Sequence, residues 1–385
     1  MKRLFISTLV FAITLAPQGF TQPTDPHLSL KKEIEQAIAR GNNWLLEQQK
    51  EMGYWDDPGL PAFTALALNA IVRDPNFNKA QKYPANIEKA FQWLIQQQKQ
   101  DGGIYNRGLG VYNTATSVTA MVATGREDLE PALVKGRAYL VNSQWDVGEK
   151  GKTDNPNDGG IGYGSDDSYT NLSTTYLAIE AIALSDSVVG DGKYGDQPKL
   201  NYEAALTFLS RCQNLEETND QQWASNDPVN KGGVIYAPGQ SKGEDVITKD
   251  GRVALRSYGS MTYVGMLSMI YAKVDMNDPR VKAMKSWLGD NYTLEENPGL
   301  GPQGIYYYFQ AMAKALTAAQ MDTLPLTDGT QVDWRKELGS KLLQLQRENG
   351  SWVNDNGRFM ESNAVLVTAY SVLALEQLYD SFPKK

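Results

Sequence analysis

The sequence predicts an all-α protein whose helices form six pairs and close into a single ring. Two observations predict this fold: a short phrase recurs six times, and helical patterns flank each copy. Repeats of this length indicate an array of supersecondary units that bury their apolar faces against one another. In chain order the copies contain Trp44-Leu45, Gln49 and Gly53-Tyr54-Trp55; Trp93-Leu94, Gln98 and Gly103-Ile104-Tyr105; Tyr139-Leu140, Gln144 and Gly160-Ile161-Gly162-Tyr163; Phe208-Leu209, Gln213 and Gly233-Val234-Ile235-Tyr236; Trp287-Leu288 and Gly304-Ile305-Tyr306, without a matching glutamine; and Leu342, Gln346 and Gly350-Ser351-Trp352.

Each copy separates two helices of different character. The helix before it is amphipathic, as Ile87, Phe91 and Leu94 show by falling on one face at helical spacing. The helix after it is rich in small residues, which let helix axes approach closely and suit an inner position. The inner helices are expected at 64–68, 114–120, 172–178, 258–272, 308–319 and 363–378. No obviously polar terminal repeat is present to cap an open solenoid, which favours closure of the ring.

The repeated phrase resembles the QW motif of squalene and hopene cyclases, whose toroidal fold is shared with protein prenyltransferase β subunits. The resemblance covers residues 34–379 and implies a single closed (α/α)6 toroid of six helix-pair repeats at 34–380. It also implies that the motif ties the end of an outer helix to the start of the next inner helix. More narrowly, 257–263, 292–299 and 304–308 are similar to exported bacterial prenyltransferase/squalene-oxidase-repeat proteins, a group without an assigned activity.

The N-terminus reads as a secretory signal. Lys2-Arg3 precede an apolar stretch at 4–16 that is too short for a stable membrane span. We expect a signal peptide at 1–21, a linker at 22–33, and a periplasmic or secreted protein with no stable membrane span after signal removal. Loss of the two basic residues takes the net charge from −8 to −10. Such an acidic chain argues against nucleic acid as a partner.

The residue inventory excludes several chemistries of this fold. Cys212 and His27 are the only residues of their types, so neither a histidine-based triad nor the Asp-Cys-His zinc site of prenyltransferases can be built. No metal and no cofactor is expected. The D-x-D-D acid motif of the cyclases is absent, and its nearest match places Asn113, whose carboxamide cannot protonate an alkene, where the last acid belongs.

The resemblance implies a cavity lined by the starts of the inner helices and the loops before them. The ligand-binding residues expected there are Tyr112, Asn113, Asn171, Arg256, Tyr258, Tyr306 and Tyr307. The catalytic candidates are Asp57, Asp167, Tyr258 and Glu361. Aspartates at helix starts also serve as N-terminal caps, and the tyrosine run 306–308 also suits helix packing. Two long insertions, 144–170 and 214–256, should gather at the cavity mouth.

Three functions remain open on the sequence. The leading hypothesis is a cavity that binds a hydrophobic, amphipathic or isoprenoid-type ligand. The second is a glycan-acting hydrolase or lyase that uses cavity carboxylates and tyrosines, because helical toroids also house such enzymes. The third is a protein-interaction ring. The character of the cavity discriminates among them: dry and aromatic, open and carboxylate-rich, or filled by side chains.

Overall fold

The computed structural model describes residues 27–164, 169–248 and 251–382, and these are mostly helical. The α-helices are α1 (Leu28–Gln48), α2 (Pro61–Arg73), α3 (Ala85–Gln96), α4 (Gly110–Thr124), α5 (Glu130–Asn142), α6 (Leu172–Val189), α7 (Tyr202–Arg211), α8 (Gly259–Tyr271), α9 (Pro279–Asp290), α10 (Ile305–Ala318), α11 (Trp334–Leu345) and α12 (Ala364–Ser381). The short elements are the 3-10 helices η1 (Glu127–Leu129) and η2 (Arg358–Met360) and the strands β1 (Val246–Ile247), β2 (Val253–Ala254), β3 (Leu324–Pro325) and β4 (Gln331–Val332). The strands form two antiparallel hairpins, β1–β2 and β3–β4.

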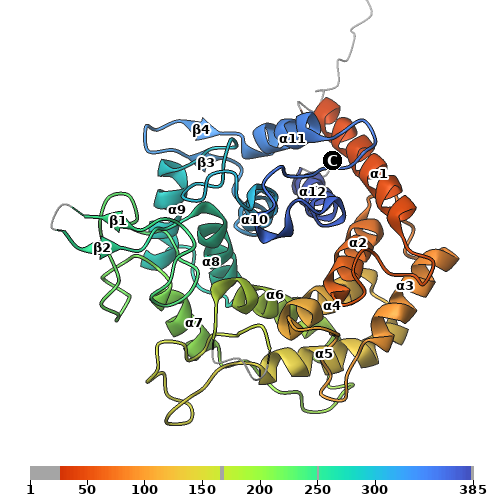
Figure 1. The fold of residues 1–385 in the computed structure, drawn as a ribbon, viewed down its shortest axis with the longest axis horizontal. Coiled ribbons are helices and arrows are strands. Elements are labelled where there is room, and N and C mark those ends of the chain that lie inside the picture. Colours follow the sequence, from red (N-terminus) through yellow and green to blue (C-terminus); the bar gives the residue numbers. More distant parts are fainter. Residues whose placement is uncertain (1–26, 165–168, 249–250, 383–385) are drawn as a thin grey trace, which may run out of the picture.

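The helices lie in two layers around a common centre (Figure 1). The even-numbered helices form the inner layer; each packs against the next along the chain, and α12 also packs against α2. The odd-numbered helices lie outside them. In α3 the apolar stripe of Ile87, Phe91 and Leu94 is buried while Lys89 is exposed. The six expected inner segments therefore fall on the six inner helices.

Glutamines of the repeated phrase join consecutive outer helices. The Gln98 side-chain amide donates to the carbonyls of Gly102 and Ala132, at 2.9 and 2.8 Å, and Ala132 lies in the first turn of α5. Gln49, Gln144, Gln213 and Gln346 make equivalent bonds to the carbonyls of Asn86, Asn201, Arg280 and Ala37. The expectation of a link to the next inner helix is wrong for the glutamine, whose partner is the next outer helix.

Threonines of the inner helices make the link within five of the six repeats. The backbone N–H of Ile104, just after the outer helix, donates to Thr114 Oγ1 in α4 at 2.8 Å. The same bond joins Trp55 to Thr64, Ile161 to Thr175, Val234 to Thr262 and Trp352 to Thr368. These bonds fix the loop onto its own inner helix, while the glutamine fixes it to the following repeat.

A glycine allows the close contact at each of these joints. Gly102 has φ +91°, and a Cβ there would lie 2.4 Å from the carbonyl oxygen of Lys135 in α5. Gly53, Gly159, Gly232 and Gly350 occupy the same position, each with φ between +85° and +100° and each against the next outer helix. Three copies of the phrase contain two consecutive glycines, and the sequence pattern places the second of them, Gly103, Gly160 or Gly233, in the phrase. In the structure the first glycine of each pair occupies the joint, so this placement is wrong by one residue. Either glycine could adopt such a turn, and the sequence does not distinguish them.

The fifth copy of the phrase has no such joint. Gly304-Ile305-Tyr306 is the start of α10, with Gly304 as its N-cap. The outer helices α9 and α11 are instead connected by side chains. The Tyr292 hydroxyl donates to Glu337 Oε2 at 2.8 Å, and Lys341 Nζ lies 2.7 Å from Glu295 Oε2. In the fifth repeat these side-chain contacts to α11 therefore take the place of the glutamine joint.

The N-terminal boundaries are only partly described. The expected signal peptide at 1–21 lies outside the described residues. Helix α1 begins at Leu28, inside the expected linker, and packs against α11 and α12. Among the described helices, α6 is long and apolar enough to cross a membrane by length and composition; it lies in the inner layer, between α4 and α8.

Candidate functional site

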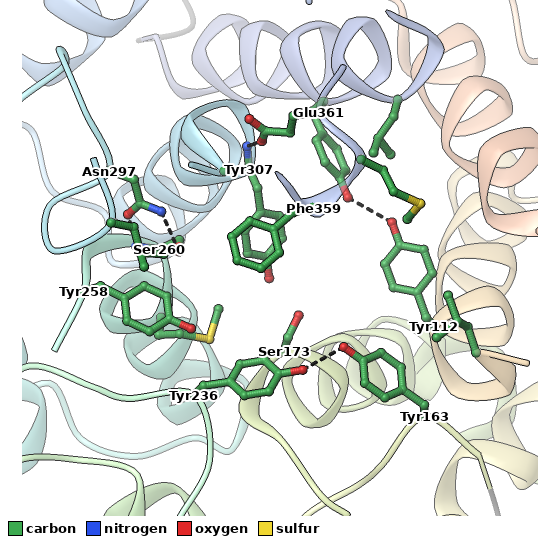
Figure 2. A pocket seen from close by; sticks show the side chains of 17 residues that line it. Tyr112, Tyr163, Ser173, Tyr236, Tyr258, Ser260, Asn297, Tyr307, Phe359 and Glu361 are labelled. Atoms are coloured by element: carbon green, nitrogen blue, oxygen red, sulfur yellow. Dashed lines mark hydrogen bonds between the residues drawn. The ribbon is translucent and has the colours of Figure 1, made fainter. Parts of the chain in front are cut away.

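A cavity of about 190 Å³ lies where the starts of several inner helices meet the loops around them (Figure 2). Six of its lining residues are tyrosines: Tyr112, Tyr163, Tyr236, Tyr258, Tyr307 and Tyr370. The others are Leu109, Ser173, Ser260, Met261, Asn297, Leu300, Gly304, Phe359, Met360, Glu361 and Leu366. The long loops between α5 and α6 and between α7 and α8 contribute Tyr163 and Tyr236, as expected of the two insertions.

Four of the tyrosine hydroxyls pair across repeats. The hydroxyls of Tyr112 and Tyr370 lie 2.9 Å apart, and those of Tyr163 and Tyr236 lie 2.7 Å apart. Burial raises the pKa of Tyr112 to about 12 and also raises the pKa of Tyr236 and Tyr370. These three phenols therefore stay neutral at physiological pH, and the pairs bring together loops and helices that are distant in sequence.

Two tyrosines leave a hydroxyl without a partner. Tyr258 is the N-cap residue of α8, and no described residue forms a hydrogen bond with its hydroxyl. The buried Tyr307 hydroxyl points toward the Ser173 side chain (Figure 2) but makes no hydrogen bond of normal length with it or with another described residue. Burial raises the pKa of both phenols. Buried hydroxyls normally find a partner, so these two can bond to a polar group of a ligand or to water.

Glu361 is fully buried beside the cavity and caps a neighbouring helix. Its carboxylate accepts hydrogen bonds from the backbone N–H groups of Tyr306 and Tyr307, at 3.3 and 2.8 Å, and from Asn354 Nδ2 at 2.7 Å. Burial raises the pKa of Glu361, whereas these donors oppose that shift. Gly304, the N-cap residue of α10, has no side chain that could accept these N–H groups, so the Glu361 carboxylate supplies the acceptor there.

The residues before Glu361 form a strained apolar wall. Phe359 and Met360 have φ of +59° and +63°, and both are 42% exposed while lining the cavity. Non-glycine residues in this left-handed region cost about 1–3 kcal/mol each and cluster at functional sites.

The same tyrosines also border a second, smaller space. Tyr112, Tyr307 and Tyr370 line a space of about 30 Å³ that also contacts Glu180 and Lys314. Lys314 Nζ lies 2.7 Å from Glu180 Oε1 in an almost fully buried ion pair. The smaller space thus contains a charged pair, whereas the larger cavity is lined chiefly by tyrosines and apolar side chains.

Of the predicted catalytic residues, the structure brings Tyr258 and Glu361 together at the cavity. Asp57 does not line it; its carboxylate forms a partly exposed ion pair with Arg107 at 2.6 Å and accepts the N–H of Gly59. Asp167 lies outside the described residues.

Of the predicted ligand-binding residues, Tyr112, Tyr258 and Tyr307 line the cavity and four do not. Asn113 accepts the N–H of Ala62 and so caps α2, and Asn171 caps its own helix, α6. Tyr306 packs against Phe309. Arg256 is half-buried in the loop before α8, and its Nη1 has no hydrogen-bond partner.

Several lining residues escaped the sequence reasoning. Tyr163 and Tyr236 belong to copies of the repeated phrase, and the repeat pattern by itself predicts only a structural role for them. Tyr370 lies two helical turns beyond Asn363, so the period of α12 could have placed it on the cavity face. No sequence pattern predicts that Phe359 lines the cavity, because its position depends on a left-handed backbone conformation at a non-glycine residue.

Comparisons with known proteins support the fold. No family model matches the sequence, and no curated protein matches it. A structure of a variant of the type II terpene cyclase MstE from Scytonema, in complex with its substrate geranylgeranyl dihydroxybenzoate, is similar with a TM-score of 0.52 at 12% identity, over 92% of this chain and 100% of that one. An α-amylase from Clostridium perfringens gives 0.53 at 13% identity, over 92% and 99%. A family 76 glycoside hydrolase from a bovine Bacteroides thetaiotaomicron strain gives 0.54 at 10% identity, over 90% and 78%.

At these identities the likeness shows the fold alone. The chain shares the helical toroid architecture of terpene cyclases and of glycoside hydrolases. Shared architecture does not carry a shared reaction, so function has to be argued from the cavity.

Proposed function

We propose that this protein is an exported, closed (α/α)6 toroid of six QW-type repeats that binds a hydrophobic or isoprenoid-type ligand in its tyrosine-lined cavity. The observation that carries the proposal is the lining itself: six tyrosines with Leu, Met and Phe side chains around about 190 Å³ of space. Closure is supported by the packing of α12 against α2. The apolar stretch at 4–16 after Lys2-Arg3 supports export to the periplasm or medium.

The size of the cavity limits what it holds. An engineered protein cavity of about 150 Å³ accommodates benzene. The present cavity of about 190 Å³ therefore suits roughly six to eight carbon atoms, with the rest of a ligand extending through the mouth. A short isoprenoid fits this space, whereas a squalene-sized chain would need the site to widen.

The wall offers apolar and hydroxyl contacts to such a ligand, and Glu361 is the one charged residue among the described residues that line it. Aromatic faces and branched carbons bury its apolar body, and the free hydroxyls of Tyr258 and Tyr307 can bond to one polar group. The ligand of the similar terpene cyclase, geranylgeranyl dihydroxybenzoate, is itself an isoprenoid with an aromatic head.

The glycan alternative finds less support at this site. Glycosidases generally use two carboxyl groups flanking the scissile bond. Glu361 is the only acid among the described residues that line the cavity, and its oxygens accept backbone and amide N–H groups. Of the other two acids considered from the sequence, Asp57 does not line the cavity and Asp167 lies outside the described residues. The third alternative, an interaction ring, predicts a cavity filled by side chains and does not account for the open space.

Calorimetric titration with geraniol tests the proposal. Ser173→Phe should fill the cavity and abolish binding, because Ser173 lies in its wall. Ser187→Phe is the matched control, since Ser187 is exposed near the end of the same helix, α6. We expect one geraniol per chain for the wild type and for Ser187→Phe. Absence of binding to the wild type, or unchanged binding by Ser173→Phe, would overturn the proposal.

A further inference from the structure

Two basic side chains pack against aromatic rings that line the cavity, although neither is itself a lining residue. Lys242 Nζ lies 4.3 Å from the centroid of the Tyr236 ring, and the Arg358 guanidinium carbon lies 5.0 Å from that of Phe359. Both rings line the cavity. A cation over an aromatic face is attracted by the electron-rich ring, so a cation–π contact holds each of these two cations in place.

Lys242 and Arg358 are adjacent in space although they are distant in sequence. The Arg358 guanidinium donates from Nη2 to the backbone carbonyl of Lys242 at 3.5 Å and also donates to Gln303 Oε1. Arg358 is exposed and Lys242 is half-buried. The loop before α8 and the η2 segment thus meet beside the cavity and bring two like charges together.

This pair of charges has no acidic counterpart nearby. Among the described residues, no aspartate or glutamate forms an ion pair with Lys242 or Arg358. Burial, and then the charge of Arg358, lower the pKa of Lys242. Like charges held together cost free energy unless an anion compensates them, and here they are held together in a chain of net charge −8.

We propose that Lys242 and Arg358 bind the anionic group, a carboxylate or a phosphate, of a ligand whose apolar body occupies the tyrosine-lined cavity. This inference rests on the proposed function and deepens it, because it names an amphipathic anion as the ligand class. Arg358 retains donors beyond those used by Gln303 and Lys242, and Lys242 has three donors on its ammonium group. The ligand would lie with its head at the two cations and its chain among the tyrosines.

Three probes that share one carbon chain separate head from tail: geraniol is neutral, geranate carries a carboxylate, and geranyl monophosphate carries a phosphate. Their affinities would be measured by calorimetry for the wild type, Lys242→Gln and Arg358→Gln. Lys31→Gln is the matched control, because Lys31 Nζ also lies over a tyrosine ring, 4.6 Å from the centroid of Tyr379, but outside the cavity.

We expect at least one anion to bind about tenfold more tightly than geraniol at low salt, and each cavity variant to lose about fivefold of that affinity. Geraniol binding should be unchanged by both substitutions, and Lys31→Gln should bind all probes like the wild type. The tighter of the two anions identifies the head group as carboxylate or phosphate.

Two results would overturn the inference, and they differ in what they leave standing. If geraniol bound as tightly as both anions and Lys242→Gln and Arg358→Gln changed nothing, the cavity would bind ligands without an anion subsite. If no probe bound to the wild type, the proposed function would fail together with this inference.

Discussion

The side-chain amide of Gln346, just after α11, donates a hydrogen bond to the backbone carbonyl of Ala37 in α1, 309 residues earlier and 2.9 Å away. The same amide donates to the carbonyl of Gly350, as the glutamines of four other repeats do to their own loops. The joint that connects consecutive repeats elsewhere therefore also connects the last repeat to the first. The same hydrogen-bond pattern that joins neighbouring repeats elsewhere thus joins two residues from opposite ends of the helical array.

Removal of this joint should destabilise the protein and loosen its N-terminal helix. Gln346→Ala leaves the Ala37 and Gly350 carbonyls without their donor, which should cost about 1–3 kcal/mol of unfolding free energy. Denaturant unfolding measures the loss, and amide hydrogen exchange should show faster exchange in α1. Gln344→Ala, an exposed position on the same helix, should leave both unchanged. Equal effects of the two substitutions would show that the joint contributes nothing.

The glycine of each joint should tolerate no side chain. Gly102→Ala would place a Cβ 2.4 Å from the Lys135 carbonyl, whereas Gly108, also at positive φ, has no atom within 4 Å of its added Cβ. Gly108→Ala should therefore cost only backbone strain, about 1 kcal/mol, and Gly102→Ala at least about 2 kcal/mol more. Thermal and denaturant unfolding check both. Similar losses for the two variants would contradict the steric role of Gly102.

The cavity tyrosines should respond to loss of their hydroxyls in opposite ways. Tyr112→Phe leaves the buried Tyr370 hydroxyl without its partner and should cost about 1–2 kcal/mol. Tyr307→Phe removes a buried hydroxyl that has no partner, so stability should be unchanged or rise by up to about 1 kcal/mol. Unfolding by urea compares them. A larger loss for Tyr307→Phe than for Tyr112→Phe would be inconsistent with this pairing.

A buried acid in α12 should make stability depend on pH. Both carboxylate oxygens of Glu376 are buried without a hydrogen bond, and its nearest recorded cation, Arg73, lies 3.8 Å away. Burial raises its pKa well above the usual value; Arg73 and Lys79 oppose this, while Asp74 and Asp380 add to it. The folded state therefore holds a proton more tightly than the unfolded chain does.

The sign of the effect follows from this difference in proton affinity. The stabilising contribution of Glu376 is fully present below its unfolded pKa of about 4.3 and is lost as the pH rises through the folded pKa. Glu376→Gln keeps the shape without the charge. Its melting temperature should match that of the wild type near pH 4 and exceed it increasingly as the pH rises. A difference that stays constant over that range would contradict the raised pKa.

The helix pairs and part of the cavity lining can be predicted from the sequence. The repeat period located the inner helices, because small-residue runs and glycine-bounded phrases are local signals. Tyr258 and Glu361 were found because the starts of inner helices meet at the centre of the ring. Asn113 and Asn171 were misjudged as lining residues, since an amide at a helix start serves backbone N–H groups as well as a ligand. The Gln98–Ala132 link needs the neighbouring repeat in place, which no local pattern reveals.

The most direct test of the central claim is native mass spectrometry of the wild-type protein, purified without detergent, alongside Ser173→Phe. We predict one small apolar or amphipathic molecule bound per wild-type chain and none on the variant whose cavity is filled. Identical spectra for the two proteins, with no bound molecule that dissociates on activation, would contradict a ligand-binding cavity. An oligosaccharide on the wild type would instead support the glycan alternative.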